Sequence, residues 1–416
     1  MLKHYLSLSL KVFARRKFFT FVSLFGISFT LIVLMLVSAL VDHAVAPFPP
    51  EVHQDRTLGI YFASMSGEHF RRNGAAGFKL LDGYLRNIPG VERMSIVSYP
   101  NGAMSYLNGT RVQSYLKRTD GEFWRIMRFD FLEGAPFTTD DLDAHRMVAV
   151  INESTRRRFF GDGVRAVGRT IEIDGQRFAV IGVVRDVPIL RLVPFSDVWV
   201  PYTTDRSDTY RQEIVGDMMG LFLARSTADL PAIKSEVRSR VQRVPTDDPK
   251  TFTKVIARAE TLFESAARAV ATGGDAEVEH PGRRLQIVLA GLALLFMLLP
   301  AVNLVNLNVS RIMERASEIG VRKSFGASSV VLVGQFLVEN VALTLIGAAI
   351  ALVLSIWLLW ALNGSGLILY ADLRMNYRIF LAGLGFALFF GTVSGVYPAW
   401  RMSRLNPVQA LKGVSR

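Results

Sequence analysis

Apolar residues gather in four blocks along this chain, and the long stretch after the first block mixes apolar and polar residues as soluble domains do. The first block, 18–41, contains no Asp, Glu, Lys or Arg. As a helix it would rise about 36 Å, enough to cross the ~30 Å hydrocarbon core of a bilayer. Three further blocks cover 285–307, 341–362 and 379–397. The pattern predicts an α-helical membrane protein with four transmembrane helices and a large domain between helices one and two.

Basic residues predict the orientation of these helices. Lys and Arg precede the first block and recur in the loop 308–340 and in the tail 398–416. The positive-inside rule therefore places both termini and this loop in the cytoplasm, and the domain 42–284 and the short loop 363–378 outside. A cleaved signal peptide is the alternative for the first block, but its apolar run is longer than the roughly 7–15 residues typical of such a peptide.

Composition narrows the classes of function. The 416 residues carry a net charge of +12, which in a soluble protein would raise nucleic acid as a partner. Here many basic residues flank the apolar blocks, so membrane topology accounts for the charge and no nucleic-acid partner is expected. The chain contains no cysteine, which excludes disulfides and thiol chemistry.

The external domain mixes strand and helix signals, which predicts an α+β fold. Asp174-Gly175 between the alternating runs 170–173 and 176–184 predicts a hairpin with a type I′ turn. The run 147–151 predicts a strand, and Asn152 is expected to cap a helix that follows it and ends at Gly161.

Two more helices are predicted later in the domain. Asp229 is expected to cap the first, and one face of that helix carries Leu230, Ile233, Val237 and Val241. The second covers 251–271, leads back toward the membrane and is ended by Gly273-Gly274.

The sequence offers no catalytic constellation. The six histidines form no HExxH pattern, and neither a GxSxG elbow nor a GxxxxGK[ST] phosphate loop occurs. The acidic run 140–143 is typical of a solvated turn. A membrane-anchored enzyme is therefore the least favoured class of function, and we expect no catalytic, cofactor-binding or metal site.

The loop after the second block carries a charged stripe. If that block continues as a helix into the cytoplasm, Arg311, Arg315, Glu318 and Arg322 lie on one face, and Glu318 can pair with Arg322 four residues later. Exposed pairs of this kind contribute only about 0.3–0.5 kcal/mol, so stability alone explains the stripe poorly. A docking site for a partner protein and a loop that merely faces lipid headgroups both fit the pattern.

Two features follow the stripe. Gly326 is expected to end its helix, and Ser328 or Ser329 to cap the next one. Glu339 lies near the cytoplasmic start of the third block, where an ionisable group is a functional candidate. We expect Glu339 to make an intramembrane polar contact rather than to relay protons.

Several short runs carry a family resemblance. EIGVRK at 318–323, GAS at 326–328 and YPA at 397–399 strongly resemble the signature of FtsX-like, MacB-type ABC transporter permeases. The segment 148–184 looks like the MacB-like periplasmic core domain of that family.

The resemblance implies a permease of the bacterial inner membrane that is not itself an enzyme. Such permeases work as dimers with cytoplasmic ATPase subunits and transmit force from ATP hydrolysis to their periplasmic domains. ATP and Mg would bind the ATPase, which must be a separate chain because this one has no fused ATPase domain. By this resemblance, the residues that couple to the ATPase are Arg315, Glu318, Gly320, Arg322, Lys323, Gly326 and Ser328.

The resulting organisation has nine segments. They are the cytoplasmic N-terminus 1–17, transmembrane helix 18–41, the periplasmic core domain 42–284, transmembrane helix 285–307, the cytoplasmic elbow and coupling helix 308–340, transmembrane helix 341–362, a periplasmic loop 363–378, transmembrane helix 379–397 and the cytoplasmic tail 398–416.

The implied partners are an ABC ATPase dimer, a second permease copy or a sister permease, membrane lipids, and an adaptor with an outer-membrane channel. The favoured function is export or extraction of a peptide, antibiotic, lipoprotein or other amphiphile. The alternative is a regulatory subunit that activates a periplasmic hydrolase or sensor without moving cargo. The choice of cargo, and of homodimer or heterodimer, stays open at this point.

Overall fold

The computed structural model describes residues 13–15, 17–45, 49–107, 109–273, 278, 281–292, 294–295, 298 and 329–403. The chain divides into two compact units. A helical unit comprises Met1–Asp42, Ile287–Ser365 and Leu373–Arg416. A domain unit comprises His43–Gln286 together with the short segment Gly366–Asp372.

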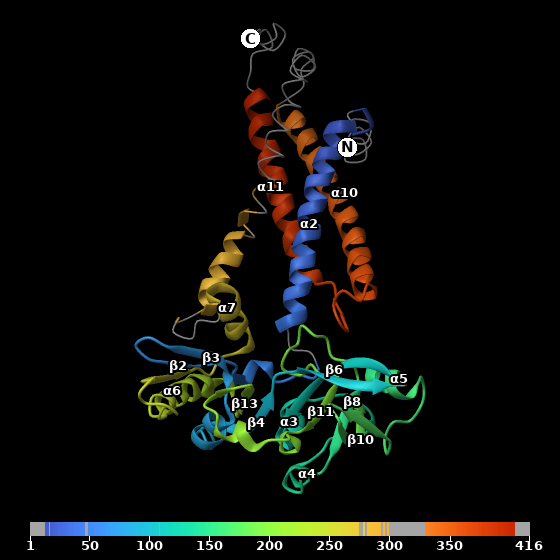
Figure 1. The fold of residues 1–416 in the computed structure, drawn as a ribbon. Coiled ribbons are helices and arrows are strands. Elements are labelled where there is room, and N and C mark those ends of the chain that lie inside the picture. The colour runs from blue at the N-terminus through green and yellow to red at the C-terminus, as the bar shows by residue number, and fades with distance from the viewer. Residues whose placement is uncertain are drawn as a thin grey trace. The chain divides into compact units, whose positions relative to one another are not determined.

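The described part of the helical unit contains three long helices, α2 (Lys17–Val45), α10 (Ser329–Gly364) and α11 (Tyr377–Ser403) (Figure 1). Residues 13–15 and 287–292 of this unit are also helical. Among the described residues, Lys17–His43 and Val333–Gly364 are long and apolar enough to cross a membrane.

A shorter apolar stretch, Tyr377–Val393, lies in α11. The predicted block 379–397 overlaps it, whereas most of the block 285–307 lies outside the described residues.

Small and polar residues lie where these helices meet. Ser28 Oγ donates to the carbonyl oxygen of Gly347 at 2.8 Å, and a Cβ on Gly347 would lie only 3.0 Å from Ile27. Asn340 Nδ2 donates to the carbonyl oxygen of Gly391 at 3.2 Å and so joins α10 to α11. Close approach at small residues and interhelical hydrogen bonds are the contacts that hold helices together in lipid.

The described residues of the domain unit form two seven-stranded sheets. The first sheet has the order β1 (Thr57–Ile60), β13 (Met218–Ala224), β3 (Arg71–Ala76), β2 (Ala63–Ser66), β14 (Lys254–Ala257), with β4 (Val91–Ser98) also on β13 and β12 (Val215–Gly216) also on β3. The second has the order β5 (Asn101–Leu107), β6 (Thr110–Thr119), β11 (Val198–Pro201), β8 (Val148–Asn152), β10 (Gln176–Val184), β7 (Phe131–Gly134), with β9 (Thr170–Ile173) on β10.

Most strand pairs are antiparallel, but β10 runs parallel to β8 and β11 runs parallel to β6. The domain contains the helices α3 (Gly121–Ile126), α4 (Thr139–Asp143), α5 (Glu153–Phe160), α6 (Leu230–Val241) and α7 (Leu262–Thr272), and residues 281–286 are also helical. Short 3₁₀ turns cover Gln54–Arg56, Tyr202–Thr204, Asp208–Gln212 and Thr227–Asp229, and a π turn covers Leu80–Tyr84. The predicted α+β fold of this domain is confirmed.

Strand alternation explains how the two sheets pack. On β13, Phe222 faces a core shared with α6, whereas Leu221 and Leu223 face a middle core. On β11, Trp199 enters that same middle core, while Val198 and Val200 face a third core on the outer side of the second sheet. Since successive side chains of a strand point to opposite faces, the two sheets are stacked across the middle core. In Figure 1, α6, β2 and β13 mark one half of the domain, and β8, β10 and α5 mark the other.

Several local predictions are confirmed. The hairpin β9–β10 has the predicted bounds, and Asp174 and Gly175 have φ of 47° and 68°, as a type I′ turn requires. Asn152 Oδ1 accepts from the backbone N–H of Thr155 at 2.8 Å and caps α5, which ends at Gly161 with φ of 96°.

One local prediction holds in part, and another is wrong. Asp229 is the N-cap residue of α6, but its side chain does not cap that helix. Its carboxylate instead accepts from the Ser226 N–H at 3.0 Å and completes a capping box at the start of the preceding 3₁₀ turn. The predicted helix 251–271 is split: Lys254–Ala257 is strand β14, paired with β2, and only α7 is helical. Pairing with a distant strand overrides local helix propensity here.

The acidic run 140–143 also differs from the predicted turn. It lies in the short helix α4, where Asp141 completes a capping box with Thr138.

Candidate functional site

The residues predicted to couple to an ATPase lie outside the described residues. They are Arg315, Glu318, Gly320, Arg322, Lys323, Gly326 and Ser328. Glu339 is described: it is buried in the helical unit, where its carboxylate accepts from Gln335 Nε2 at 3.2 Å. The contact to Gln335 lies within α10, and the functional role of Glu339 stays a prediction. No cluster of His, Cys, Asp and Glu suited to a metal occurs among the described residues.

The clearest built site in the domain unit is the attachment of α7, the helix after which the chain continues toward the predicted second span. Thr261 caps α7, and its Oγ1 accepts from the N–H of Glu264 at 3.2 Å while Glu264 reaches back to the N–H of Thr261 at 2.8 Å. Gly273 ends the helix in the left-handed conformation, with φ of 61°. Local sequence thus fixes both ends of α7.

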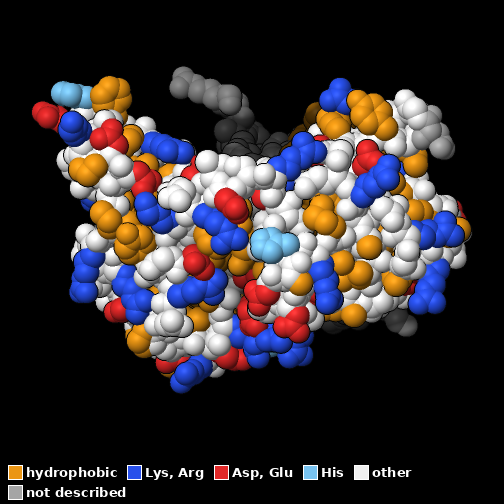
Figure 2. Space-filling model, turned by 60° about the horizontal axis from the view of Figure 1, so that its bottom comes forward, with side chains coloured by type: hydrophobic (Ala, Val, Ile, Leu, Met, Phe, Trp, Pro, Cys, Tyr) orange, Lys and Arg blue, Asp and Glu red, His pale blue; other side chains and the backbone are white. Residues whose placement is uncertain are grey.

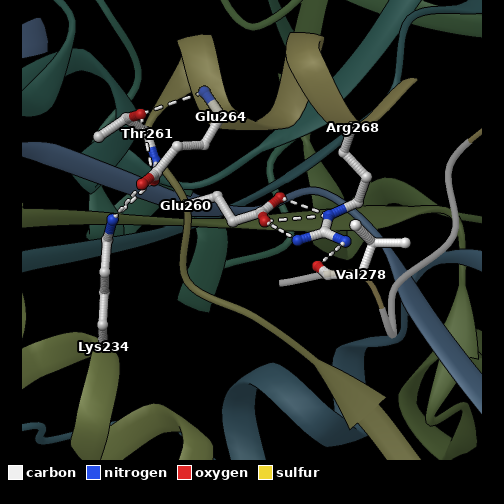
Figure 3. A network of polar contacts seen from close by, with 6 residues as sticks. All are labelled: Lys234, Glu260, Thr261, Glu264, Arg268 and Val278. Atoms are coloured by element: carbon white, nitrogen blue, oxygen red, sulfur yellow. Dashed lines mark hydrogen bonds and ion pairs between the residues drawn. The ribbon is translucent and has the colours of Figure 1, made fainter. Parts of the chain in front are cut away.

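A buried ion pair fastens α7 to the first sheet (Figure 3). Arg268 Nε donates to both carboxylate oxygens of Glu260, at 2.9 and 3.1 Å, and Nη2 donates to the same carboxylate. Arg268 Nη1 donates to the carbonyl oxygen of Val278 at 2.9 Å. The Arg268 side chain is only 2% exposed. Removing one partner of such a pair costs about 3–5 kcal/mol because the other charge stays buried.

Glu260 itself is part of the sheet edge. Its backbone exchanges two hydrogen bonds with Gly59 of β1, at 2.7 and 2.9 Å. The carboxylate that holds Arg268 is therefore positioned by the edge of the first sheet.

A second contact ties α7 to α6 (Figure 3). Lys234 Nζ lies 2.8 and 2.6 Å from the two carboxylate oxygens of Glu264. Although burial acts to raise it, the hydrogen bonds from Lys234 and Thr261 hold the pKa of Glu264 below its ordinary value. We call Glu260, Arg268, Lys234 and Glu264 the exit junction.

A different cluster lies where the chain enters the domain after α2. Arg191 Nη1 contacts Glu51 Oε2 at 3.3 Å, and both side chains are almost fully buried. Lys117 of β6, also buried, donates from Nζ to the carbonyl oxygens of Leu192, at 2.9 Å, and Val193. We call Glu51, Lys117 and Arg191 the linker cluster.

Burial dominates the electrostatics of the linker cluster. Desolvation raises the pKa of Glu51 to about 7, against the attraction of Arg191 and Lys117. Desolvation also lowers the pKa of Lys117 to about 7, against the attraction of Glu51. Two groups of opposite charge type thus have pKa values near neutrality in one buried site.

Neither site was predicted from the sequence. Glu264 and Arg268 have the spacing of an i,i+4 helical pair, yet Glu264 bonds to Lys234 and Arg268 to Glu260. Glu51 and Arg191 are 140 residues apart in the chain.

One face of the domain carries charges of both signs. Figure 2 shows Lys and Arg side chains and Asp and Glu side chains on this face, with apolar residues between them.

Comparison with known proteins places these sites in a family context. The family model for the MacB-like periplasmic core domain matches residues 20–240, and the model for the FtsX-like permease C-terminal region matches residues 290–407. This chain belongs to the MacB-like family. The resemblance to FtsX/MacB-type ABC transporter permeases is thereby confirmed.

Two proteins are similar to this chain in sequence, and one solved structure has a low similarity to it. The macrolide export ATP-binding/permease protein MacB of Burkholderia cenocepacia is 29% identical over 69% of this chain and 39% of its own length. An uncharacterised ABC transporter permease, YknZ of Bacillus subtilis, is 22% identical over 82% of this chain and 81% of its own. The periplasmic region of MacB from Actinobacillus actinomycetemcomitans has 16% identity and a TM-score of 0.34, covering 44% of this chain and 83% of that one. This chain therefore spans about two fifths of the length of the MacB relative.

The family assignment locates the two sites. Glu51, Lys117 and Arg191 lie inside the segment matched as the MacB-like domain, whereas Glu260 and Arg268 lie between the two matched segments. Glu264 also lies between them, whereas Lys234, the fourth residue of the exit junction, lies inside the MacB-like match, so the junction joins that match to the connection that follows it.

Proposed function

We propose that this chain is the permease subunit of an ABC transporter in the inner membrane, and that it couples ATP hydrolysis in a separate ATPase to motion of its periplasmic domain. Two family matches, one on each side of residues 241–289, support the permease class. In this proposal four helices cross the membrane, both termini are cytoplasmic, and the MacB-like domain is periplasmic.

The observation that carries the proposal is the fastening of α7. A helix that leads to the membrane can move a domain only if it does not slide or rotate against that domain. Arg268 fixes one side of α7 to the first sheet through Glu260, and Glu264 fixes α7 to α6 through Lys234. This arrangement supports transmission of force from the second span into the domain.

The proposed partners follow from the same class. The MacB relative is named as an ATP-binding/permease protein. By analogy we assign ATP and Mg to a cytoplasmic ATPase dimer that docks on the elbow, at Arg315, Glu318, Gly320, Arg322, Lys323, Gly326 and Ser328. A second permease copy or a sister permease would complete the complex, with an adaptor and an outer-membrane channel for export.

The proposed cargo is an amphiphile, such as a peptide, an antibiotic or a lipoprotein. The name of the MacB relative, a macrolide exporter, supports efflux of this kind of molecule. A complex that binds an ATPase and moves its domain but transports no amphiphile would favour a regulatory subunit acting on a periplasmic hydrolase or sensor.

Affinity purification from the native membrane, with mass spectrometry of the co-purifying proteins, tests the class. A stoichiometric ABC ATPase is the expected result. If no ATPase is recovered, even after mild cross-linking, the permease assignment of this chain is contradicted.

A charge reversal tests the elbow. Glu318→Lys is expected to impair ATPase association while membrane insertion stays intact, since it places like charges together on one helix face. Glu172→Lys, in an exposed pair of the domain, is the matched control.

A reporter after Arg416 should be cytoplasmic and one near Gly175 external, and any other result contradicts the four-span topology.

A further inference from the structure

The segment Gly366–Asp372 connects α10 to α11, yet it belongs to the domain unit rather than to the helical unit. We call it the latch loop. The N–H of Ile189 donates to the carbonyl oxygen of Leu369 at 3.1 Å, and the hydroxyl of Tyr370 donates to Asp197 Oδ1 at 2.7 Å. The rings of Tyr370 and Phe195 also contact each other, with centroids 6.4 Å apart.

Asp197 is a central residue of the second sheet. It is 2% exposed, its Oδ1 accepts from Asn152 Nδ2 at 3.0 Å, and its Oδ2 accepts from the N–H of Tyr115 at 2.9 Å. Its backbone pairs with the same two residues, since its N–H donates to the Tyr115 carbonyl and its carbonyl accepts from the Asn152 N–H. Tyr370 therefore binds a carboxylate that already joins β6 to the end of β8.

The backbone of Tyr370 is also unusual. Its φ is +56°, a conformation unfavourable for a residue with a Cβ. Such a conformation persists where the surrounding contacts determine it, and functional contacts are the commonest setting. Here the contacts are those of the Tyr370 ring and hydroxyl with the second sheet.

We propose that the latch loop is a second mechanical link, through which α10 and α11 act on the second sheet while α7 acts on the first. The inference rests on the proposed function, because it describes how the same motion reaches the other half of the domain. Tyr370 is a positioning residue in this account, and it holds the loop to Asp197.

The absence of native cysteine makes the link directly testable. The Ile189–Leu369 hydrogen bond brings two backbones to about the spacing of neighbouring strands, ~4.8 Å, which a disulfide or a short thiol cross-linker can span. In the complete membrane complex, Ile189→Cys with Leu369→Cys is expected to cross-link efficiently under mild oxidation.

Tyr370→Ala should then lower the cross-linking yield, and Tyr370→Phe should lower it less. Loss of a hydrogen bond to a charged acceptor changes the docking equilibrium constant by about tenfold or more. Leu367→Ala, in the same loop at a residue that is 80% exposed, is the control and should leave the yield unchanged. If the double-cysteine protein with native Tyr370 does not cross-link, or if Tyr370→Ala leaves the yield unchanged, the proposed docking of the latch loop is contradicted.

Permease-stimulated ATP hydrolysis supplies the functional readout. Tyr370→Ala should reduce stimulation severalfold, and the oxidised 189–369 cross-link should restore it until a reductant is added. Loss of stimulation without rescue, or full stimulation with an undocked loop, overturns the inference and leaves the proposed function standing. A wild-type complex with no stimulated hydrolysis at all contradicts the proposed function and the latch together.

Discussion

The exit junction and the linker cluster are both buried charge sites at the margins of one domain, but they are held in different ways. In the exit junction the Arg268 guanidinium donates to both Glu260 oxygens and to Val278, so the charges are matched by hydrogen bonds. In the linker cluster Arg191 Nη1 lies 3.3 Å from Glu51 Oε2, and burial outweighs attraction enough to bring the pKa values of Glu51 and Lys117 to about 7.

Because their charges are held differently, the two sites should respond differently to force and to pH. A charge-assisted, multiply bonded arginine resists displacement and suits the transmission of force. A site with groups that titrate near neutrality responds to pH instead. We therefore expect the exit junction to be sensitive to mutation and the linker cluster to be sensitive to pH.

The largest expected effect is at the exit junction. Arg268→Ala leaves Glu260 buried without its counter-charge and should lower the free energy of unfolding of the domain by about 3–5 kcal/mol. Chemical denaturation followed by fluorescence in the intact protein measures it. Arg177→Ala, in an exposed pair with Glu172, is the control and should cost about 0.2–1 kcal/mol. Equal losses in the two variants would remove the mechanical role assigned to Arg268.

A double replacement sharpens the same point. Glu260→Met combined with Arg268→Met removes both buried charges, so the domain should regain most of the stability lost in Arg268→Ala. Stimulated ATP hydrolysis should nevertheless stay low, because the directional hydrogen bonds are gone. Recovery of both stability and stimulation would mean that packing alone fixes α7.

The pH dependence of stability separates the linker cluster from the exit junction. The pKa of Glu51 is about 7 in the folded domain and 4.5 in the unfolded chain, so between these pH values the folded state holds the proton more tightly. The contribution of Glu51 to the free energy of unfolding therefore falls as the pH rises from 4.5 to about 7. The pKa of Lys117 is about 7 in the folded domain and 10.5 in the unfolded chain. Its contribution to the free energy of unfolding therefore rises as the pH increases from about 7 to 10.5. Each slope is at most about 1.4 kcal/mol per pH unit.

Single variants assign the two slopes. Glu51→Gln should abolish the fall between pH 4.5 and 7, and Lys117→Met should abolish the rise above 7, as measured by denaturation at a series of pH values. A wild-type stability curve without a minimum near pH 7, or one unchanged by both variants, would contradict the assignment.

The smallest expected effect belongs to the partly exposed contact between α6 and α7. Lys234→Ala should cost about 0.2–1 kcal/mol of stability, because such pairs remain solvated. Thermal unfolding beside Arg268→Ala measures it. A loss as large as that of Arg268→Ala would place the main attachment of α7 on α6 instead of the first sheet.

Local chemistry was predictable wherever the deciding residues were neighbours in sequence. Asp174-Gly175 specified its hairpin because positive φ at both positions is a local requirement, and Asn152 specified the start of α5 in the same way. Residues 254–257 were predicted as helix but form a strand paired with β2. This pairing could not be predicted from local sequence because β2 lies far away in the chain.

The candidate sites were less predictable for the same reason. Apolar block lengths and short signature runs indicated the permease family, which the comparisons confirmed. The contacts of Glu51 with Arg191 and of Tyr370 with Asp197 join residues 140 and 173 positions apart, and no local pattern encodes them. The ATPase-coupling residues of the elbow stay predictions.

The central claim is that ATP hydrolysis moves the MacB-like domain through α7. The most direct test labels Arg177→Cys in the domain and Val37→Cys in α2 and measures the distance between the labels in the reconstituted complex, with and without ATP. The account predicts a nucleotide-dependent change in that distance, and a much smaller change in Arg268→Lys, which keeps the charge but loses the guanidinium fork. An identical distance with and without ATP, in a complex that hydrolyses ATP, would contradict it.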